Sequence, residues 1–220
     1  MADGSIAIIG GTGKLGAAIA RRLAKAGRKV IIGSRSAESA ARAAAELGFG
    51  LTGLTNTEAA VAGSIVIVTV PFAAQESTLA EIAPHVVGKI VVDTTVPLMP
   101  PKVMRVQLPP EGSAAQRAQK LLGPNVKVVS AFHNVAAHKL ATDQEINCDV
   151  LVFGDDKDAR AQAVALVELT GLRAIQGGAL ANSAAAEAMT SVLIFINKTY
   201  QVDGAGVLIT GQLVPPVGSG

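Results

Sequence analysis

The sequence contains little cysteine, little aromatic residue and little net charge. Its 220 residues include one cysteine, Cys148, and no tryptophan, and only 3% are aromatic. A single cysteine cannot form an intramolecular disulfide or a cysteine-based metal site, so the sequence predicts a reducing, cytoplasmic location and no bound metal. The net charge of +2 comes from scattered basic residues, and stacking aromatics are scarce. These absences argue against a nucleic-acid partner.

Long hydrophobic runs are absent as well. No apolar run reaches the ~18 residues of a membrane helix, so we expect no membrane partner. The first residues, Met1 to Gly4, lack the basic and apolar regions of a signal peptide. Residues 214–220 are rich in proline and glycine, and we expect them to form a flexible tail.

The most informative feature that is present is a glycine-rich turn after the apolar run Ile6–Ile9. It has the pattern G-x-G-x-x-G, and apolar residues at helical spacing continue beyond it to Gly27. In such a turn the first glycine permits the tight bend, the second admits a pyrophosphate and the third lets the helix pack on the strand. The helix N-terminus then attracts the phosphates. The predicted dinucleotide-binding residues of this turn are Gly11, Thr12, Gly13, Lys14, Leu15 and Gly16.

The end of the second predicted strand, residues 29–33, indicates which dinucleotide is bound. An NAD enzyme carries an acidic residue near this point for the ribose 2′-hydroxyl. This chain has Ser34 and Arg35 instead. An acid would repel a 2′-phosphate, whereas the Arg35 guanidinium attracts it. The sequence therefore favours NADP(H), with the alternative that Ser34 and Arg35 only cap the following helix.

Alternating strand and helix patterns predict an α/β fold, a Rossmann-like doubly wound parallel sheet with a small C-terminal α/β extension packed on it. We expect an NADP-binding domain over residues 1–125 and a smaller region over 126–213 that completes the acceptor pocket and shares the sheet. The proline-rich stretch 97–113 is predicted to be an extended loop. The expected strands are 6–9, 29–33, 51–54, 65–70, 89–94, 126–131, 150–153 and 172–175. The expected later helices are 37–47, 57–63, 71–82, 114–122, 154–170 and 181–200.

Ligands of such sheets bind outside the carboxyl ends of the strands. The residues that follow the strands ending near 70 and 94 are therefore expected beside the nicotinamide ribose and ring. The predicted contacts there are Val70, Pro71, Phe72, Thr95 and Val96.

His133 follows the next strand, and its ordinary pKa near neutrality makes it a candidate acceptor contact or general acid–base group. The alternative is a histidine that only fixes its loop. His85 is expected at the surface, and His138 is expected to be structural. Asp93 and Asp143 have no acid or base in register along the sequence, so we assign them no catalytic role.

Several motifs in a fixed order resemble one family over nearly the whole chain, from Ile6 to about Leu213. They are Gly10–Gly16, Gly33-Ser34-Arg35, Thr69-Val70-Pro71, Val129–His133, Gly154-Asp155-Asp156 and Ala181-Asn182-Ser183. Together they resemble the NADPH-dependent coenzyme F420 reductases. The same domain is also similar to the cytoplasmic oxidoreductase domain of membrane ferric reductases.

The resemblance implies an oxidoreductase that transfers a hydride directly between NADP(H) and the deazaflavin F420. It places Thr12, Ser34 and Arg35 at the adenosine phosphate, Pro71 at the nicotinamide, and His133 and Gly206 beside the deazaflavin. It also implies a homodimer, to which the stretch 192–196 could contribute if that stretch is not ordinary core. The alternatives are the same fold with a flavin, pterin-like or ferric acceptor, and a non-catalytic NADP-sensing protein.

Overall fold

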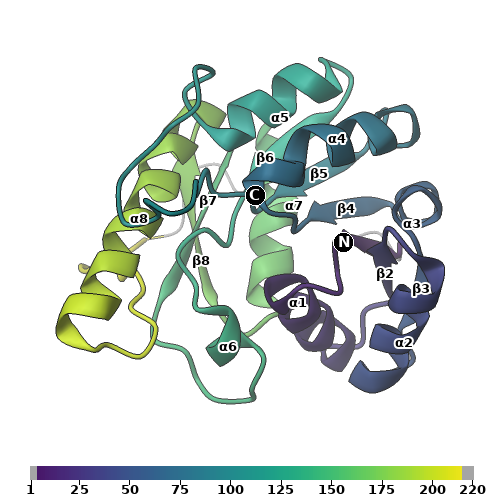
Figure 1. Cartoon of the computed structure of the whole chain (residues 1–220), viewed down its shortest axis with the longest axis horizontal. Coiled ribbons are helices and arrows are strands. Elements are labelled where there is room, and N and C mark those ends of the chain that lie inside the picture. Colours follow the sequence, from purple (N-terminus) through teal and green to yellow (C-terminus); the bar gives the residue numbers. More distant parts are fainter. Residues whose placement is uncertain (1–3, 215–220) are drawn as a thin grey trace.

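The computed structural model describes residues 4–214, which form one eight-stranded sheet with helices on both faces. The strand order is β3-β2-β1-β4-β5-β6-β7-β8. Strands β2 and β3 therefore extend the sheet on one side of β1, and β4 to β8 extend it on the other side. Figure 1 shows β2 and β3 at one end of the sheet and β8 with the long helix α8 at the other. This is the doubly wound arrangement that the sequence predicts. The strands are β1 (Ile6–Ile9), β2 (Val30–Ser34), β3 (Thr52–Thr55), β4 (Ile65–Val68), β5 (Ile90–Asp93), β6 (Lys127–Ser130), β7 (Asp149–Gly154) and β8 (Arg173–Gly178).

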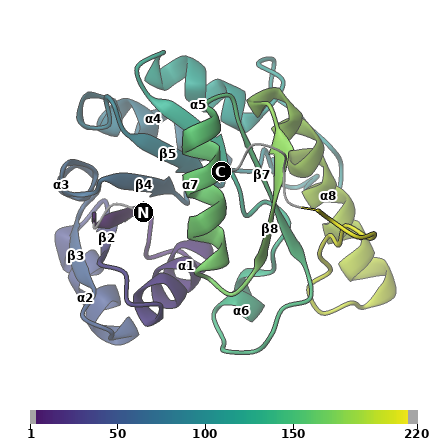
Figure 2. The ribbon, with the colours of Figure 1, turned by 180° about the vertical axis from the view of Figure 1, so that it is seen from behind.

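The helices connect these strands and form the outer layers. Figure 2, seen from behind, brings α7 in front of the sheet, whereas α4 and α5 lie on the other side. The predicted helices are all present, and the four-residue α6 is an addition that sequence patterns do not indicate. The helices are α1 (Lys14–Lys25), α2 (Ala37–Leu47), α3 (Asn56–Ala62), α4 (Phe72–Ile82), α5 (Ala114–Leu122), α6 (Ala137–Leu140), α7 (Lys157–Glu168) and α8 (Ser183–Tyr200).

The core consists of two apolar layers, one on each face of the sheet. Ile8, Ile32 and Val92 face α1, α2 and α7 in one layer. Ile9 and Val91 face α3, α4 and α5 in the other. A parallel sheet covered on both faces needs apolar residues at consecutive positions, which explains why these strands are runs of isoleucine and valine.

The sheet departs from the predicted parallel arrangement at β7, which runs antiparallel to β6 and parallel to β8. The link between β6 and β7 contains only α6 and does not cross the sheet, so β7 starts at the edge where β6 ends and runs back. We call the edge where β1, β4, β5 and β6 end the carboxyl edge.

Two predicted helix starts are also corrected. Helix α3 is capped by Thr55, not Thr57: the Thr55 hydroxyl accepts from the Glu58 amide, and the Glu58 side chain accepts from the Thr55 amide. Helix α8 starts at Ser183 without a side-chain cap, because the Asn182 side chain donates to the Gly177 carbonyl instead.

The segment Leu180–Tyr200 has the length and apolar composition of a membrane-spanning helix. The sequence analysis predicts no such segment, because polar residues interrupt its apolar runs. Composition alone is weak evidence, because the core helix of a globular protein has the same properties. In this fold, Ala186 and Leu193 of α8 are buried, and the helix packs on β7 and α5. Residues 215–220, most of the predicted tail, lie outside the described range.

Candidate functional site

The glycine turn lies at the point where the sheet changes direction, between the ends of β1 and β4. The Thr69 amide and hydroxyl both donate to the Ile9 carbonyl, at 2.9 Å each, so the turn rests on the segment after β4. A Cβ atom at Gly16 would lie 2.4 Å from Thr69 Oγ1, and one at Gly11 would lie 2.8 Å from the Ile8 carbonyl oxygen. Side chains cannot occupy these two positions, which agrees with the predicted reason for both glycines.

Helix α1 presents an open N-terminus to this turn. Its N-cap, Gly13, supplies no side-chain cap, and the first turn holds no acidic residue. Thr12, Gly13 and Lys14 are exposed. Amide groups at such a helix start lack partners within the helix, and the helix dipole favours an anion there. The structure thus has the features that a pyrophosphate-binding turn requires.

Ser34 and Arg35 stand where β2 ends, and neither caps the next helix. The cap of α2 is Ser36, whose hydroxyl accepts from the Ser39 amide at 3.3 Å. Arg35 is exposed, and within residues 4–214 its guanidinium has no hydrogen-bond or ion-pair partner. The capping alternative is therefore wrong, and this charge is available to a ligand.

Next to the turn is a pocket of 330 Å³ at the carboxyl edge. The structure brings together here every residue predicted at the nicotinamide side, along with part of the glycine turn. The lining residues are Gly13, Lys14, Leu15, Thr69, Val70, Pro71, Phe72, Thr94, Thr95, Val96 and Leu98.

His133 lines a second, smaller pocket of 130 Å³ with residues from α8. The ring is buried, and neither of its nitrogens has a partner among the described residues. Burial lowers the pKa of His133 to about 4, so the ring is neutral at pH 7. The expectation of a pKa near neutrality does not hold, and with it the general acid–base interpretation loses its basis. A neutral ring still offers one donor and one acceptor.

Helix α8 is fixed to the loop that carries His133. The Asn134 side chain donates to the Ala186 carbonyl at 2.9 Å, and the Thr190 hydroxyl donates to the His133 carbonyl at 2.9 Å. Gly206 does not line this pocket: it lines another one together with Cys148, and its neighbour Ala205 lines the His133 pocket instead. A Cβ at Gly206 would lie 2.5 Å from the Cys148 Cβ, so close packing explains this glycine.

Behind the nicotinamide-side pocket lies a buried polar network that sequence reasoning missed. Asp93 is fully buried, and its carboxylate accepts from the Thr95 hydroxyl at 2.6 Å and from Gln75 Nε2 at 2.6 Å. Burial raises the pKa of Asp93 to about 6, and the hydrogen bonds from Thr95 and Gln75 limit that rise. The sequence signal was a charged residue at the end of an apolar strand.

A second buried acid, Glu187, lies in the same interior as Asp93, although the sequence gives no sign that the two acids are related. Its carboxylate accepts from the amides of Ala114 and Ala115, at 2.6 and 3.1 Å, and so caps α5 from α8. Burial, together with a smaller contribution from the charge on Asp93, raises the pKa of Glu187 to about 7. The two acids are far apart in sequence but share one interior.

The remaining predicted residues have structural contacts. His138 Nε2 lies 2.8 Å from the Asp203 carboxylate, which ties α6 to the segment after α8. Asp143 pairs with Arg21 and Lys25 of α1 at 2.7 and 2.9 Å, and these cations hold its pKa well below its usual range. Within residues 4–214 no cluster of three metal-ligating side chains is present.

The similarity to known proteins extends over most of the chain. Residues 5–97 match the family described as NADP oxidoreductase, coenzyme F420-dependent. The F420-dependent NADP reductase of Methanothermobacter thermautotrophicus is 40% identical over 218 residues, covering 93% of this chain and 94% of that protein. The protein of the same name from Methanocaldococcus jannaschii is 41% identical, covering 93% and 97%. This chain belongs to the F420-dependent NADP reductase family.

The fold of this family member also matches a crystal structure from Arthrobacter sp. FB24. The TM-score is 0.83 at 23% identity, over 94% of this chain and 99% of that one. At this identity the match supports the fold alone.

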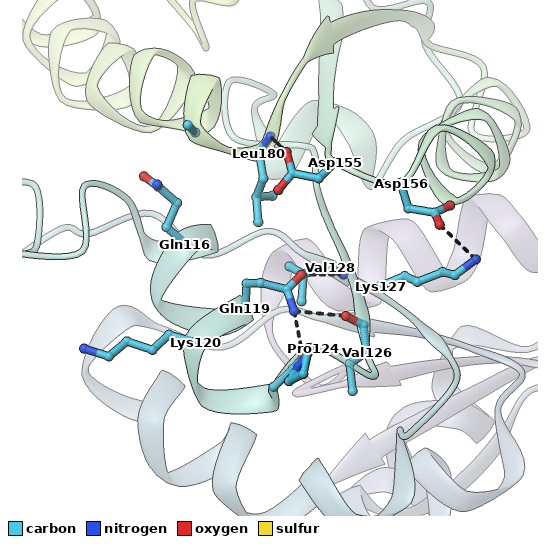
Figure 3. A pocket seen from close by; sticks show the side chains of 12 residues that line it. Gln116, Gln119, Lys120, Pro124, Val126, Lys127, Val128, Asp155, Asp156 and Leu180 are labelled. Carbon is cyan, nitrogen blue, oxygen red and sulfur yellow. Dashed lines mark hydrogen bonds and ion pairs between the residues drawn. The ribbon is translucent and has the colours of Figure 1, made fainter.

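The largest cavity of this F420-dependent NADP reductase family member is not at the carboxyl edge. Its 710 Å³ lie at the opposite edge, between α5, the start of β6 and the end of β7. Figure 3 shows that several of its polar groups already have partners within the pocket: Asp156 pairs with Lys127, and Asp155 accepts from the Leu180 amide. We assign it no ligand, because position and chemistry favour the smaller pockets.

Proposed function

We propose that this protein is an oxidoreductase that transfers a hydride directly between NADP(H) and coenzyme F420. The observation that carries the proposal is the match to F420-dependent NADP reductases over both halves of the chain. The alternative acceptors, flavin, pterin-like carrier or ferric chelate, and the non-catalytic sensing role have no comparable support. NADPH supplies the hydride from nicotinamide C4, so the protein needs to hold two rings together and keep water out.

The binding residues divide by position. We propose that the glycine turn, residues 11–16, holds the pyrophosphate, and that Thr12, Ser34 and Arg35 hold the adenosine phosphate. The open start of α1 and the unpaired Arg35 charge support this assignment. Pro71 and its pocket neighbours then lie at the nicotinamide, as the lining of the 330 Å³ pocket suggests. The region 126–213 completes the acceptor pocket.

We further propose that His133 contacts the acceptor as a neutral hydrogen-bonding group, with Gly206 nearby. An imidazole with two unpaired nitrogens in a buried place is costly, and a ligand that bonds to it removes that cost. Because its pKa is about 4, His133 would act by orientation and not by proton transfer at neutral pH. Direct hydride transfer needs no protein acid or base at the reacting carbons.

One assay tests the acceptor and the role of His133 together. Purified protein mixed with NADPH and oxidised F420 is expected to bleach the deazaflavin absorbance. His133→Ala is expected to reduce kcat/KM for F420 by about tenfold, the value of one good hydrogen bond, with NADPH affinity unchanged. His85→Ala, remote on the short helix after α4, is the control. No bleaching while NADPH still binds would refute the proposed acceptor, and unchanged F420 kinetics would make His133 structural.

We also propose a cytoplasmic homodimer that binds neither nucleic acid nor membrane. Support for the dimer comes from α8, where Met189, Val192 and Phe195 are exposed at 40%, 42% and 50%. Exposed apolar side chains gathered on one helix are typical of protein interfaces. Sedimentation should give twice the chain mass, and Phe195→Glu should give the monomer. A monomeric wild-type protein would contradict the dimer.

A further inference from the structure

The Thr95 side chain has a fixed orientation in the nicotinamide-side pocket. Its hydroxyl lies 2.6 Å from Asp93 Oδ1 and 3.5 Å from the Val70 carbonyl oxygen, so the shorter contact with the carboxylate takes its one proton. Its amide donates to the same carboxylate oxygen at 3.2 Å. A threonine hydroxyl has one proton and two lone pairs. With the proton committed to a buried carboxylate, Thr95 Oγ1 can act only as an acceptor toward the pocket.

The other carboxylate oxygen is fixed by α4. Gln75 Nε2 donates to Asp93 Oδ2 at 2.6 Å and to the Ala114 carbonyl at 3.0 Å. Gln75 lies one turn beyond Phe72, which lines the same pocket. The donors to Asp93 therefore come from α4 and from the segment after β5, and both of these also contribute residues to the pocket lining, so the carboxylate connects two parts of the pocket wall.

A third element supports this arrangement from behind. The Ala114 amide donates to Glu187 Oε2 at 2.6 Å, while the Ala114 carbonyl accepts from Gln75. The Ser183 and Ser113 hydroxyls lie 2.8 Å apart beside it. Helix α8, which also lines the His133 pocket, is thereby connected to Asp93 through one residue of α5. Buried hydrogen bonds thus fix the position of Thr95.

We propose that Asp93 is a positioning residue, and that it holds Thr95 Oγ1 as the acceptor for the carboxamide N–H of the nicotinamide ring. This inference rests on the proposed function, in which that pocket holds the nicotinamide. The carboxamide is the one polar donor on the ring. A fixed acceptor for it selects one rotation of the ring and therefore the face of C4 that is presented to the second pocket.

The test compares NADP⁺ with its 3-acetylpyridine analogue, in which a methyl ketone replaces the carboxamide and no N–H donor remains. Affinities are measured by calorimetry, well above the Asp93 pKa of about 6. Thr95→Val is expected to weaken NADP⁺ binding by about three- to tenfold and to leave the analogue unchanged. Thr95→Ser, which keeps the hydroxyl, should restore NADP⁺ affinity.

Asp93→Asn tests the positioning residue itself. Its amide oxygen can still accept from Thr95. Its amide nitrogen would meet Gln75 Nε2, so the Gln75 amide must flip to present its unpartnered Oε1, at the cost of the bond from Nε2 to the Ala114 carbonyl. Because the bond from Thr95 is kept, NADP⁺ affinity is expected to stay within about twofold, whereas Asp93→Ala should resemble Thr95→Val. Thr78→Val, a buried threonine one turn further along α4, is the control with no expected effect on either dinucleotide.

Equal loss of NADP⁺ and analogue affinity in Thr95→Val would assign Thr95 to general packing and overturn the inference. Unchanged NADP⁺ affinity would overturn it too. Calorimetry needs no F420, so this test is independent of the proposed acceptor. If the binding pattern is as expected but F420 is not reduced, only the proposal of F420 as the acceptor is rejected.

Discussion

Replacement of Arg35 by alanine is expected to raise the KM for NADPH by about 10- to 100-fold while the KM for NADH changes little. A hydrogen-bonded guanidinium–phosphate contact contributes about 1.5–3 kcal/mol, and each 1.4 kcal/mol is a factor of ten. NADH has no 2′-phosphate, so it loses nothing with this side chain. Arg35 has no partner within residues 4–214, so its removal breaks no internal contact that would confuse the result.

The same strand provides a matched control. Lys29 is an exposed cation just before β2, at the end of the strand away from the glycine turn. Lys29→Ala removes the same charge and should leave both constants unchanged. An equal effect of Arg35→Ala on the KM values for NADPH and NADH would contradict the assignment of Arg35 to the 2′-phosphate. If Lys29→Ala also raised the KM for NADPH, the effect of Arg35→Ala would reflect long-range electrostatics and not a direct contact.

Gly13→Ala and Gly16→Ala are expected to fail in different ways. A Cβ at Gly16 meets Thr69 Oγ1 at 2.4 Å and the Gly11 Cα at 2.8 Å, so the variant must shift packed backbone. Its free energy of unfolding should fall by about 1–3 kcal/mol, and its NADPH affinity should fall with it. A Cβ at Gly13 would lie 3.3 Å from the Gly10 carbonyl oxygen and 4.0 Å from the Thr69 carbonyl oxygen, so stability should be largely kept.

The Gly13 variant isolates the ligand contact. Its new methyl group would stand at the exposed start of α1, where the proposed pyrophosphate lies closest to backbone, and we expect NADPH affinity to fall at least about tenfold. Thermal melting and NADPH fluorescence titration on both variants measure the two effects. Full NADPH affinity in Gly13→Ala would place the phosphates elsewhere.

The sequence indicates where the glycine turn and the adjacent pocket lie, because these signals are local, while the binding of NADP(H) by these residues stays a prediction. The glycine turn and the Ser34-Arg35 pair depend on residues adjacent in the chain, and the pocket at Pro71 and Thr95 follows from the rule for strand ends. Fold class follows from strand and helix periodicity in the same way. The direction of a strand within the sheet is harder to predict. Strand β7 has the apolar pattern of a buried strand, and that pattern is the same whether the strand runs parallel or antiparallel to its neighbour.

The buried acids show what local patterns cannot provide. Asp93 and Glu187 are 94 positions apart, and nothing near either one indicates that they share an interior. The pKa of His133 was misjudged for a related reason, since it depends on the burial produced by α8 and not on the residues beside it. Tertiary packing determines these properties, so a single sequence does not reveal them.

The second pocket takes part of its lining from a segment late in the chain. The His133 pocket is lined by the loop after β6, by α8 and, from the segment after α8, by Ala205. This segment is held at the start of β7, where the Asp149 amide donates to the Val207 carbonyl and the Ile209 amide donates to the Asp149 carboxylate. Ala205 thus brings into the second pocket a segment that is separate from the dinucleotide half. A substitution in this segment would reshape the second pocket and leave the glycine turn in place.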